Sequence, residues 1–122
     1  MAVEQDWRDS MKYYISPEQA DAVKMRSIAR YGKDKQTTVC MEECAELIQA
    51  ISKLKRYDPY DPNNTVGRAE LIENLYEEMA DVCICLDLLT EIYGLKQSDL
   101  RRMINHKIWR MKRRLEAQGE KF

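Results

Sequence analysis

Two pairs of acidic residues have the types and the spacing to bind a metal ion. Glu43 and Glu46 lie three residues apart in one apolar segment, and Glu78 and Asp81 repeat that spacing in a later one. Residues three apart share a face of an α-helix, where two like charges weaken the helix by roughly 0.2–0.5 kcal/mol. Four carboxylates on two facing helices would suit Mg²⁺, with Mn²⁺ as a substitute, because Mg²⁺ binds carboxylates, waters and substrate phosphates together.

The apolar residues around the acids indicate where the carboxylates point. In the first segment Glu43 falls inside an apolar stripe and Glu46 flanks it; the stripe consists of Cys40, Leu47, Ile51 and Leu54. In the second, Glu78 falls inside a stripe and Asp81 flanks it; that stripe consists of Leu71, Leu75, Val82, Leu86, Leu89 and Tyr93. A carboxylate at a helix interface is costly unless something positive compensates it. Either pair alone is typical of a solvated face, but two pairs in matching phase predict a metal site.

Local signals predict the two helices and the loop in the first half of the chain. A first helix should begin after Ser16, which opens a capping box, and should end at Gly32, which suits a left-handed cap. The polar stretch 33–38 should then lead into a second helix that ends near Arg56. The proline-containing stretch 57–64 cannot continue that helix and is expected to be a loop.

Two further helices are expected in the second half. The third should cover about residues 66–93 and end at Gly94, and the fourth should cover about 98–118 with Ser98 as its cap. No segment has the alternation that is typical of a strand. The sequence therefore predicts an all-α fold, an antiparallel bundle of about four main helices in a single domain over residues 1–122.

Composition excludes several classes of protein. A formal net charge of -1 gives no general affinity for nucleic acid or for anionic membranes, and no apolar run approaches the roughly 20 residues that cross a bilayer. The first residues lack the basic end and apolar stretch of a signal peptide, so we expect a cytoplasmic protein. The tails, residues 1–12 and 119–122, are expected to be poorly ordered. The cysteines lack zinc-site spacing and are expected to be small buried hydrophobes: Cys40, Cys44, Cys83 and Cys85.

The acidic motifs also resemble those of a known family. The runs 42–47 (EECAEL) and 77–82 (EEMADV) resemble the ExxE…ExxD signature of the MazG-like nucleoside triphosphate pyrophosphohydrolases. These are all-α enzymes related to dimeric dUTPases and to phosphoribosyl-ATP pyrophosphohydrolase. The resemblance covers about residues 28–114 and includes Gln36 and the run 105–110 (NHKIWR), although the connection between the motifs is longer than usual.

The resemblance implies a magnesium-dependent hydrolase that splits NTP or dNTP into the monophosphate and pyrophosphate. It implies metal binding by Glu43, Glu46, Glu78 and Asp81, and phosphate contacts from Lys107 and Arg110. It also implies a homodimer or homotetramer, whose assembly would complete the bundle. Glu42 or Glu46 is expected to accept the proton of the attacking water, and further substrate contacts are expected from Gln36, Lys53 and Asn105.

Two other functions remain open at the level of sequence. One is the same chemistry on another nucleotide, such as phosphoribosyl-ATP. The other is a non-catalytic helical interaction protein whose acids are structural. The basic last helix fits a phosphate clamp and fits equally a solvated cationic helix end.

Overall fold

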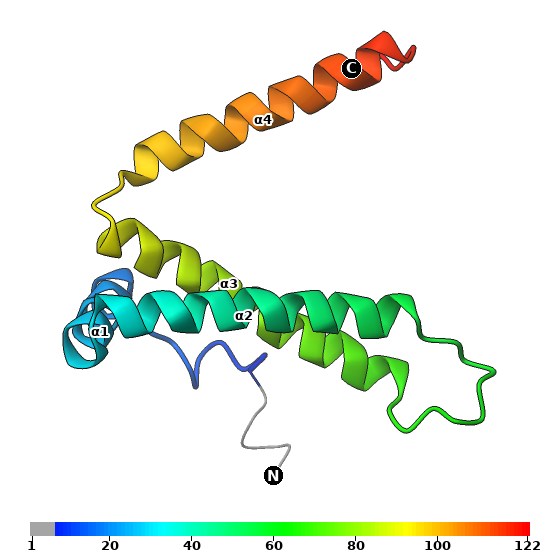
Figure 1. Cartoon of the computed structure of the whole chain (residues 1–122), viewed down its shortest axis with the longest axis horizontal. Helices are drawn as coiled ribbons and strands as arrows, with labels where there is room; N and C mark the ends of the chain where they lie inside the picture. The colour runs from blue at the N-terminus through cyan, green and yellow to red at the C-terminus, as the bar shows by residue number, and fades with distance from the viewer. Residues whose placement is uncertain (1–6) are drawn as a thin grey trace.

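The computed structural model describes residues 7–122, which form four helices (Figure 1): α1 (Pro17–Tyr31), α2 (Lys33–Lys55), α3 (Arg68–Ile92) and α4 (Gln97–Ala117). No strand occurs among these residues, so the all-α prediction is confirmed. None of these helices combines the length and the apolar character that crossing a bilayer requires. The expectation about the tail is testable only from residue 7 onward, because residues 1–6 lie outside the described part.

The first helix begins and ends at the residues that its capping signals predict. The Ser16 side chain accepts a hydrogen bond from the Gln19 backbone N–H at 3.2 Å, and the Gln19 side chain accepts one from the Ser16 N–H at 3.3 Å. This reciprocal pair satisfies two donors that a helix start leaves unpaired. At the other end Gly32 has φ 89°, and its N–H donates to the carbonyl of Ile28 at 2.8 Å.

The second helix begins earlier than the sequence predicts. Residues 33–38 were expected to be a connecting stretch, but they form the first turns of α2. Their polar side chains are compatible with a helix because the hydroxyls of Thr37 and Thr38 donate to the carbonyls of Lys33 and Asp34, one turn back. A single residue, Gly32, therefore separates α1 from α2.

The remaining boundaries follow the predictions with one exception. Residues 57–64 lie in a loop that Asp58 and Asp61 stabilise by accepting backbone N–H groups two residues ahead, at 3.0 and 2.9 Å. Helix α3 ends before Gly94, which has φ 64°. Ser98 does not cap α4, which begins at Gln97 and has no side-chain cap.

Helices α2 and α3 pack against each other, and α1 crosses both at one end (Figure 1). The small core lies at that end and consists of Ile28, Cys40, Cys85, Leu88 and Ile92. The predicted stripes are wrong at Ile51, Leu86 and Tyr93, which are exposed. In the C-terminal part of α3, the buried face instead consists of Cys85, Leu88 and Ile92. The buried face of this part of the helix is therefore rotated relative to the predicted stripe.

Helix α4 leaves the other helices after Gly94 and points away from them (Figure 1). Among the described residues it makes no substantial packing contact with α1, α2 or α3, and none of its residues is buried. Three helices therefore pack together within one chain. Exposed apolar side chains recur along α4 at three- and four-residue steps: Leu100, Ile104, Ile108, Met111 and Leu115.

The described parts of both tails form local hydrogen bonds. Near the N-terminus, Asp9 accepts hydrogen bonds from the backbone N–H groups of Met11 and Lys12 at 3.2 and 3.1 Å. Near the C-terminus, the N–H of Glu120 donates to the carbonyl of Leu115 at 3.0 Å, and Gly119 has φ 97°. That bond closes the last turn of α4 as a left-handed helix end does.

Candidate metal centre

The packed faces of α2 and α3 bring the two acidic pairs together. One carboxylate oxygen from each of Glu43, Glu46 and Glu78 lies within 4.8 Å of the others. Asp81, one turn along α3 from Glu78, stands beside Glu43 and adds its charge to the cluster. The interface forms here because Cys40 and Cys85 are buried between the same two helices on one side of the acids, and Ala50 of α2 is buried on the other.

Both central acids carry a buried oxygen that has no hydrogen-bond partner among residues 7–122. Oε2 of Glu43 and Oε2 of Glu78 are inaccessible to solvent and have no hydrogen-bond partner. Within residues 7–122, neither carboxylate forms an ion pair with a lysine or arginine. A buried carboxylate oxygen normally has a hydrogen-bond donor or a cation beside it, since leaving it unpaired costs several kcal/mol. A divalent cation bound by oxygen ligands is one partner that fits this donor set.

Crowding of negative charge changes the titration of the same two acids. Burial, followed by the charges of Asp81 and Glu46, raises the pKa of Glu43 to about 7. Burial, followed by the charges of Glu46 and Asp81, raises the pKa of Glu78 above its ordinary 4.5. Both effects disfavour the ionised form. A bound cation would reverse them, because it favours ionised oxygen ligands.

The other residues predicted on α2 lie at different distances from the cluster. Glu42 is exposed and does not belong to the group of converging carboxylates. Gln36 is buried two turns before Glu43, and its side-chain oxygen accepts a hydrogen bond from the Ser27 hydroxyl at 3.5 Å. The structure thus places Gln36 at the contact with α1. Only Glu46 is both exposed and within the cluster.

Lys53 lies in a polar pocket of about 630 Å³ at the open end of the α2–α3 pair. The pocket also contains Arg56 from the end of α2 and Asn74 from α3, together with residues of the connecting loop. Asn74 precedes Glu78 by one helical turn. A polar pocket lined by two cationic side chains and by Glu70 therefore begins one turn from the acidic cluster, and Lys53 is the one of its residues that the sequence predicted at the site.

The residues predicted on the last helix are not brought to the acids within one chain. Lys107 and Arg110 are exposed on α4, which packs on neither α2 nor α3. Asn105 lies in an open pocket on α4 itself, beside Arg101 and Ile108. A phosphate clamp formed by α4 and the acids therefore requires a second chain or a movement of α4.

The cysteines divide into two groups. Cys40 and Cys85 are buried at the α2–α3 contact, where the Cys40 thiol donates to the Cys85 carbonyl at 3.7 Å. Burial, followed by the hydrogen bond with Cys40, raises the pKa of the Cys85 thiol to about 12. Cys44 and Cys83 are exposed, so the prediction that all four are buried is wrong for these two. Each faces outward because it lies off the packed face of its helix.

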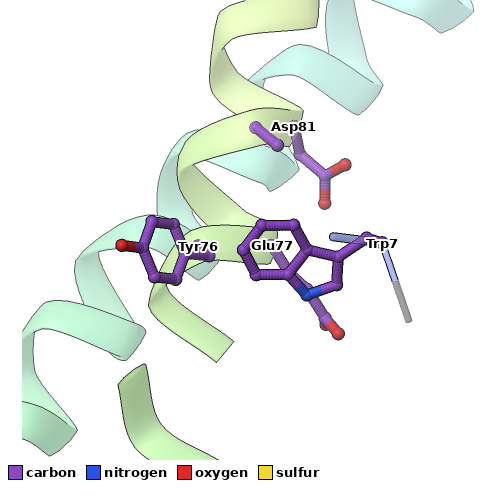
Figure 2. A pocket seen from close by; sticks show the side chains of 5 residues that line it. Trp7, Tyr76, Glu77 and Asp81 are labelled. Atoms are coloured by element: carbon purple, nitrogen blue, oxygen red, sulfur yellow. The ribbon is translucent and has the colours of Figure 1, made fainter. Parts of the chain in front are cut away.

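A second pocket, which sequence reasoning missed, lies directly beside Asp81. It is about 530 Å³ in volume and is lined by Trp7, Tyr76, Glu77, Ala80 and Asp81 (Figure 2). A contact between residue 7 and a helix some seventy residues later has no periodic signal in the sequence, so spacing could not have revealed it.

The fold and the site thus define an all-α protein. Two packed helices bring four acidic side chains together beside a pocket with aromatic walls. Comparison of the chain with protein-family models, with curated proteins and with solved structures finds no match.

Proposed function

We propose that this chain is a magnesium-dependent pyrophosphohydrolase that converts a nucleoside triphosphate and water into the monophosphate and pyrophosphate. One observation carries the proposal: four acids from α2 and α3 converge, and two of them hold a buried oxygen without a hydrogen-bond partner. The resemblance of residues 42–47 and 77–82 to the MazG-like signature supports the same reaction class.

The acids would hold the metal in the proposed enzyme. Glu43, Glu46, Glu78 and Asp81 supply hard oxygen ligands on two rigid helices, as Mg²⁺ prefers. When bound, the ion would supply Lewis-acid polarisation of the phosphate oxygens. Glu46 is the exposed member of the cluster. It is therefore the carboxylate that we propose as proton acceptor for the attacking water.

The proposed step balances as a simple hydrolysis. The water oxygen bonds to the α-phosphorus while the bond from that phosphorus to the bridging oxygen breaks. The electron pair leaves with pyrophosphate, and the proton of the water passes to Glu46. Lys53 and Arg56, in the polar pocket one turn from the acids, would offset the negative charge of the departing group.

We further propose that the enzyme is a homo-oligomer in which α4 packs on a second copy. The apolar stripe of α4 is uncovered in the single chain, and exposed apolar surface of this kind marks interaction sites. Charge favours a second copy as the partner, because α4 carries a large excess of basic residues whereas α3 carries a large excess of acidic ones. Such packing would bring Lys107 and Arg110 toward the acids of the other chain.

Product analysis tests the reaction directly. The protein is incubated with each common NTP and dNTP in Mg²⁺ or Mn²⁺, with phosphoribosyl-ATP as a further substrate, and the products are separated by ion-exchange chromatography. We expect monophosphate and pyrophosphate in equal amounts, and ¹⁸O from labelled water in the monophosphate. Release of diphosphate and orthophosphate would place the chain in another reaction class. A lack of turnover with every substrate would favour a non-catalytic interaction protein.

A further inference from the structure

The pocket beside Asp81 has walls that suit a flat ring. Trp7 and Tyr76 contact each other with ring centroids 5.2 Å apart and planes inclined at 52°. Ala80 of α3 also lines the pocket, whose volume of about 530 Å³ lies within the range of small-molecule sites. Because the two rings touch, a flat ligand would lie against them and not between them. Base–aromatic contacts of this kind bind nucleotides by stacking.

Trp7 is fixed in this position by contacts with α3. Its indole N–H donates to Oε2 of Glu73 at 2.8 Å, and the neighbouring Arg8 forms an ion pair with the other oxygen of Glu73. The Arg8 guanidinium also lies over the indole, 4.2 Å from its centroid. Despite these contacts 44% of Trp7 and 52% of Tyr76 remain exposed. The pocket is thus formed by anchored side chains whose rings are open to a ligand.

The position of the pocket relates it to the acidic cluster. Asp81 lines the pocket (Figure 2), and it also stands beside Glu43 in the cluster. In a nucleotide only the ribose separates the base from the α-phosphate. A substrate whose phosphates lie at the cluster would therefore place its base in a neighbouring pocket. Of the two pockets next to the acids, this one has two aromatic side chains in contact with each other, whereas the pocket of Lys53 has one, Tyr57, among mostly polar side chains.

The charge at the edge of the pocket favours particular bases. Glu77 lines the pocket together with Asp81, and an ionised carboxylate only accepts hydrogen bonds. Adenine and cytosine each carry an amino group that donates at the edge where thymine presents a carbonyl oxygen, and guanine carries its amino group at C2. A carbonyl oxygen that faces a carboxylate is repelled and leaves both groups without a donor.

We propose that the Trp7–Tyr76 pocket binds the base of the nucleotide and that Glu77 selects bases with an exocyclic amino group over uracil and thymine. This inference rests on the proposed function, since it assigns the base subsite of the same substrate. Cytosine and uracil provide the cleanest comparison, because they differ at the edge where cytosine carries its amino group.

Fluorescence of Trp7 tests the pocket without requiring turnover. The chain has two tryptophans, so Trp109→Phe leaves Trp7 as the only one. This protein is titrated with CMP, UMP and inorganic tripolyphosphate in Mg²⁺. We expect saturable quenching by CMP, about tenfold weaker binding of UMP for one lost charge-assisted hydrogen bond, and no quenching by tripolyphosphate, which has no base.

Variants within the same background assign the roles of the pocket residues. Tyr76→Ala should weaken CMP binding by at least about fivefold, whereas Tyr76→Phe, which keeps the ring, should not. Glu77→Gln should make the affinities for CMP and UMP nearly equal, because an amide both donates and accepts. Glu91→Gln removes an exposed charge from α3 outside the pocket and should keep the preference for CMP.

The outcomes separate the pocket from the proposed reaction. Pyrophosphate release without any CMP-dependent change in Trp7 emission would overturn the base pocket and leave the proposed function standing. Saturable quenching by CMP without pyrophosphate release from any triphosphate would overturn the proposed function and leave the pocket standing. Equal affinity for CMP and UMP in the parent protein would overturn the role of Glu77.

Discussion

Glu43 and Glu78 each interrupt the packed face of a helix, and this is the property that made them recognisable in the sequence. Their phase relative to Cys40 and Leu75 depends only on helical periodicity, so it could be predicted without knowledge of the tertiary structure. The convergence of Glu43, Glu46 and Glu78 within 4.8 Å agrees with that phase. By contrast, the aromatic pocket depends on a contact between Trp7 and α3, which no local pattern encodes.

Neutralising either central acid should abolish activity without lowering the stability of the fold. We expect Glu43→Gln and Glu78→Gln each to abolish pyrophosphate release, because each removes a charged ligand. Both variants should be as stable as the wild type or more stable, since the change relieves burial and repulsion of charge. The measurements are pyrophosphate release and thermal unfolding, with Glu91→Gln as a control for charge on α3. Near-normal turnover of either variant would argue against the metal centre.

The raised pKa of Glu43 predicts how stability depends on pH without metal. The unfolded carboxyl titrates near 4.5 and the folded one near 7, so between these values the folded protein binds more protons than the unfolded chain. The free energy of unfolding should therefore fall as pH rises from 4.5 to 7 and level off above that range. Urea unfolding followed by circular dichroism measures this trend.

Magnesium should oppose that loss, because it binds the ionised acids and not the protonated ones. In millimolar Mg²⁺ the stabilisation should grow as pH rises through the same range. The double variant Glu43→Gln/Glu78→Gln should show neither the pH trend nor the magnesium effect. An equal magnesium effect in both proteins would show that the ion acts elsewhere.

The ends of the helices are the features of the fold that could be predicted most fully from the sequence, because local chemistry sets them. Helices begin or end at Ser16 with Gln19, at Gly32 and at Gly94. At each of these positions a backbone or side-chain hydrogen bond joins residues that are close in the sequence. The start of α2 was predicted too late because polar residues do not break a helix unless they bind the backbone in another conformation. The direction of α4 could not be predicted, since no contact within the chain determines it.

The break between α1 and α2 should depend on Gly32 alone. Its φ of 89° with ψ of 152° lies in a region that residues with a Cβ rarely adopt. No atom lies within 4 Å of a Cβ built at this position, so the cost of Gly32→Ala would arise from the backbone. We expect a loss of about 1–3 kcal/mol in the free energy of unfolding, measured by urea denaturation.

Gly67 provides a matched control for that substitution. It also has open space around a built Cβ, but its φ of -76° is compatible with alanine. Gly67→Ala should change the free energy of unfolding by less than about 0.5 kcal/mol, because reduced freedom of the unfolded chain offsets a weaker helix cap. Equal losses at both positions would show that the conformation of Gly32 is not what costs stability.

On the scale of the whole molecule, the single chain leaves much apolar surface uncovered. Its core cluster lies at one end of the α2–α3 pair, while α4 exposes an apolar stripe along its length. A monomeric protein rarely presents such a stripe, since covering it would stabilise the fold. The long basic helix α4 and the acidic helix α3 are complementary in charge, and two copies could bury them against each other reciprocally, as in a two-fold symmetric dimer.

Sedimentation of a pair of α4 variants should test this assembly. Ile104→Asp places a charge in the middle of the apolar stripe, and His106→Asp places the same side chain on the opposite side of the helix. We expect the wild type and His106→Asp to sediment as dimers or tetramers of the 14.4 kDa chain, and Ile104→Asp to dissociate. Both variants should keep their helical circular dichroism, because α4 packs on no other helix of its own chain to any substantial extent.

A monomeric wild type at micromolar concentration, or equal dissociation of both variants, would rule out the stripe as the subunit contact. Loss of pyrophosphate release in Ile104→Asp together with dissociation would support delivery of Lys107 and Arg110 to the acids of the other copy.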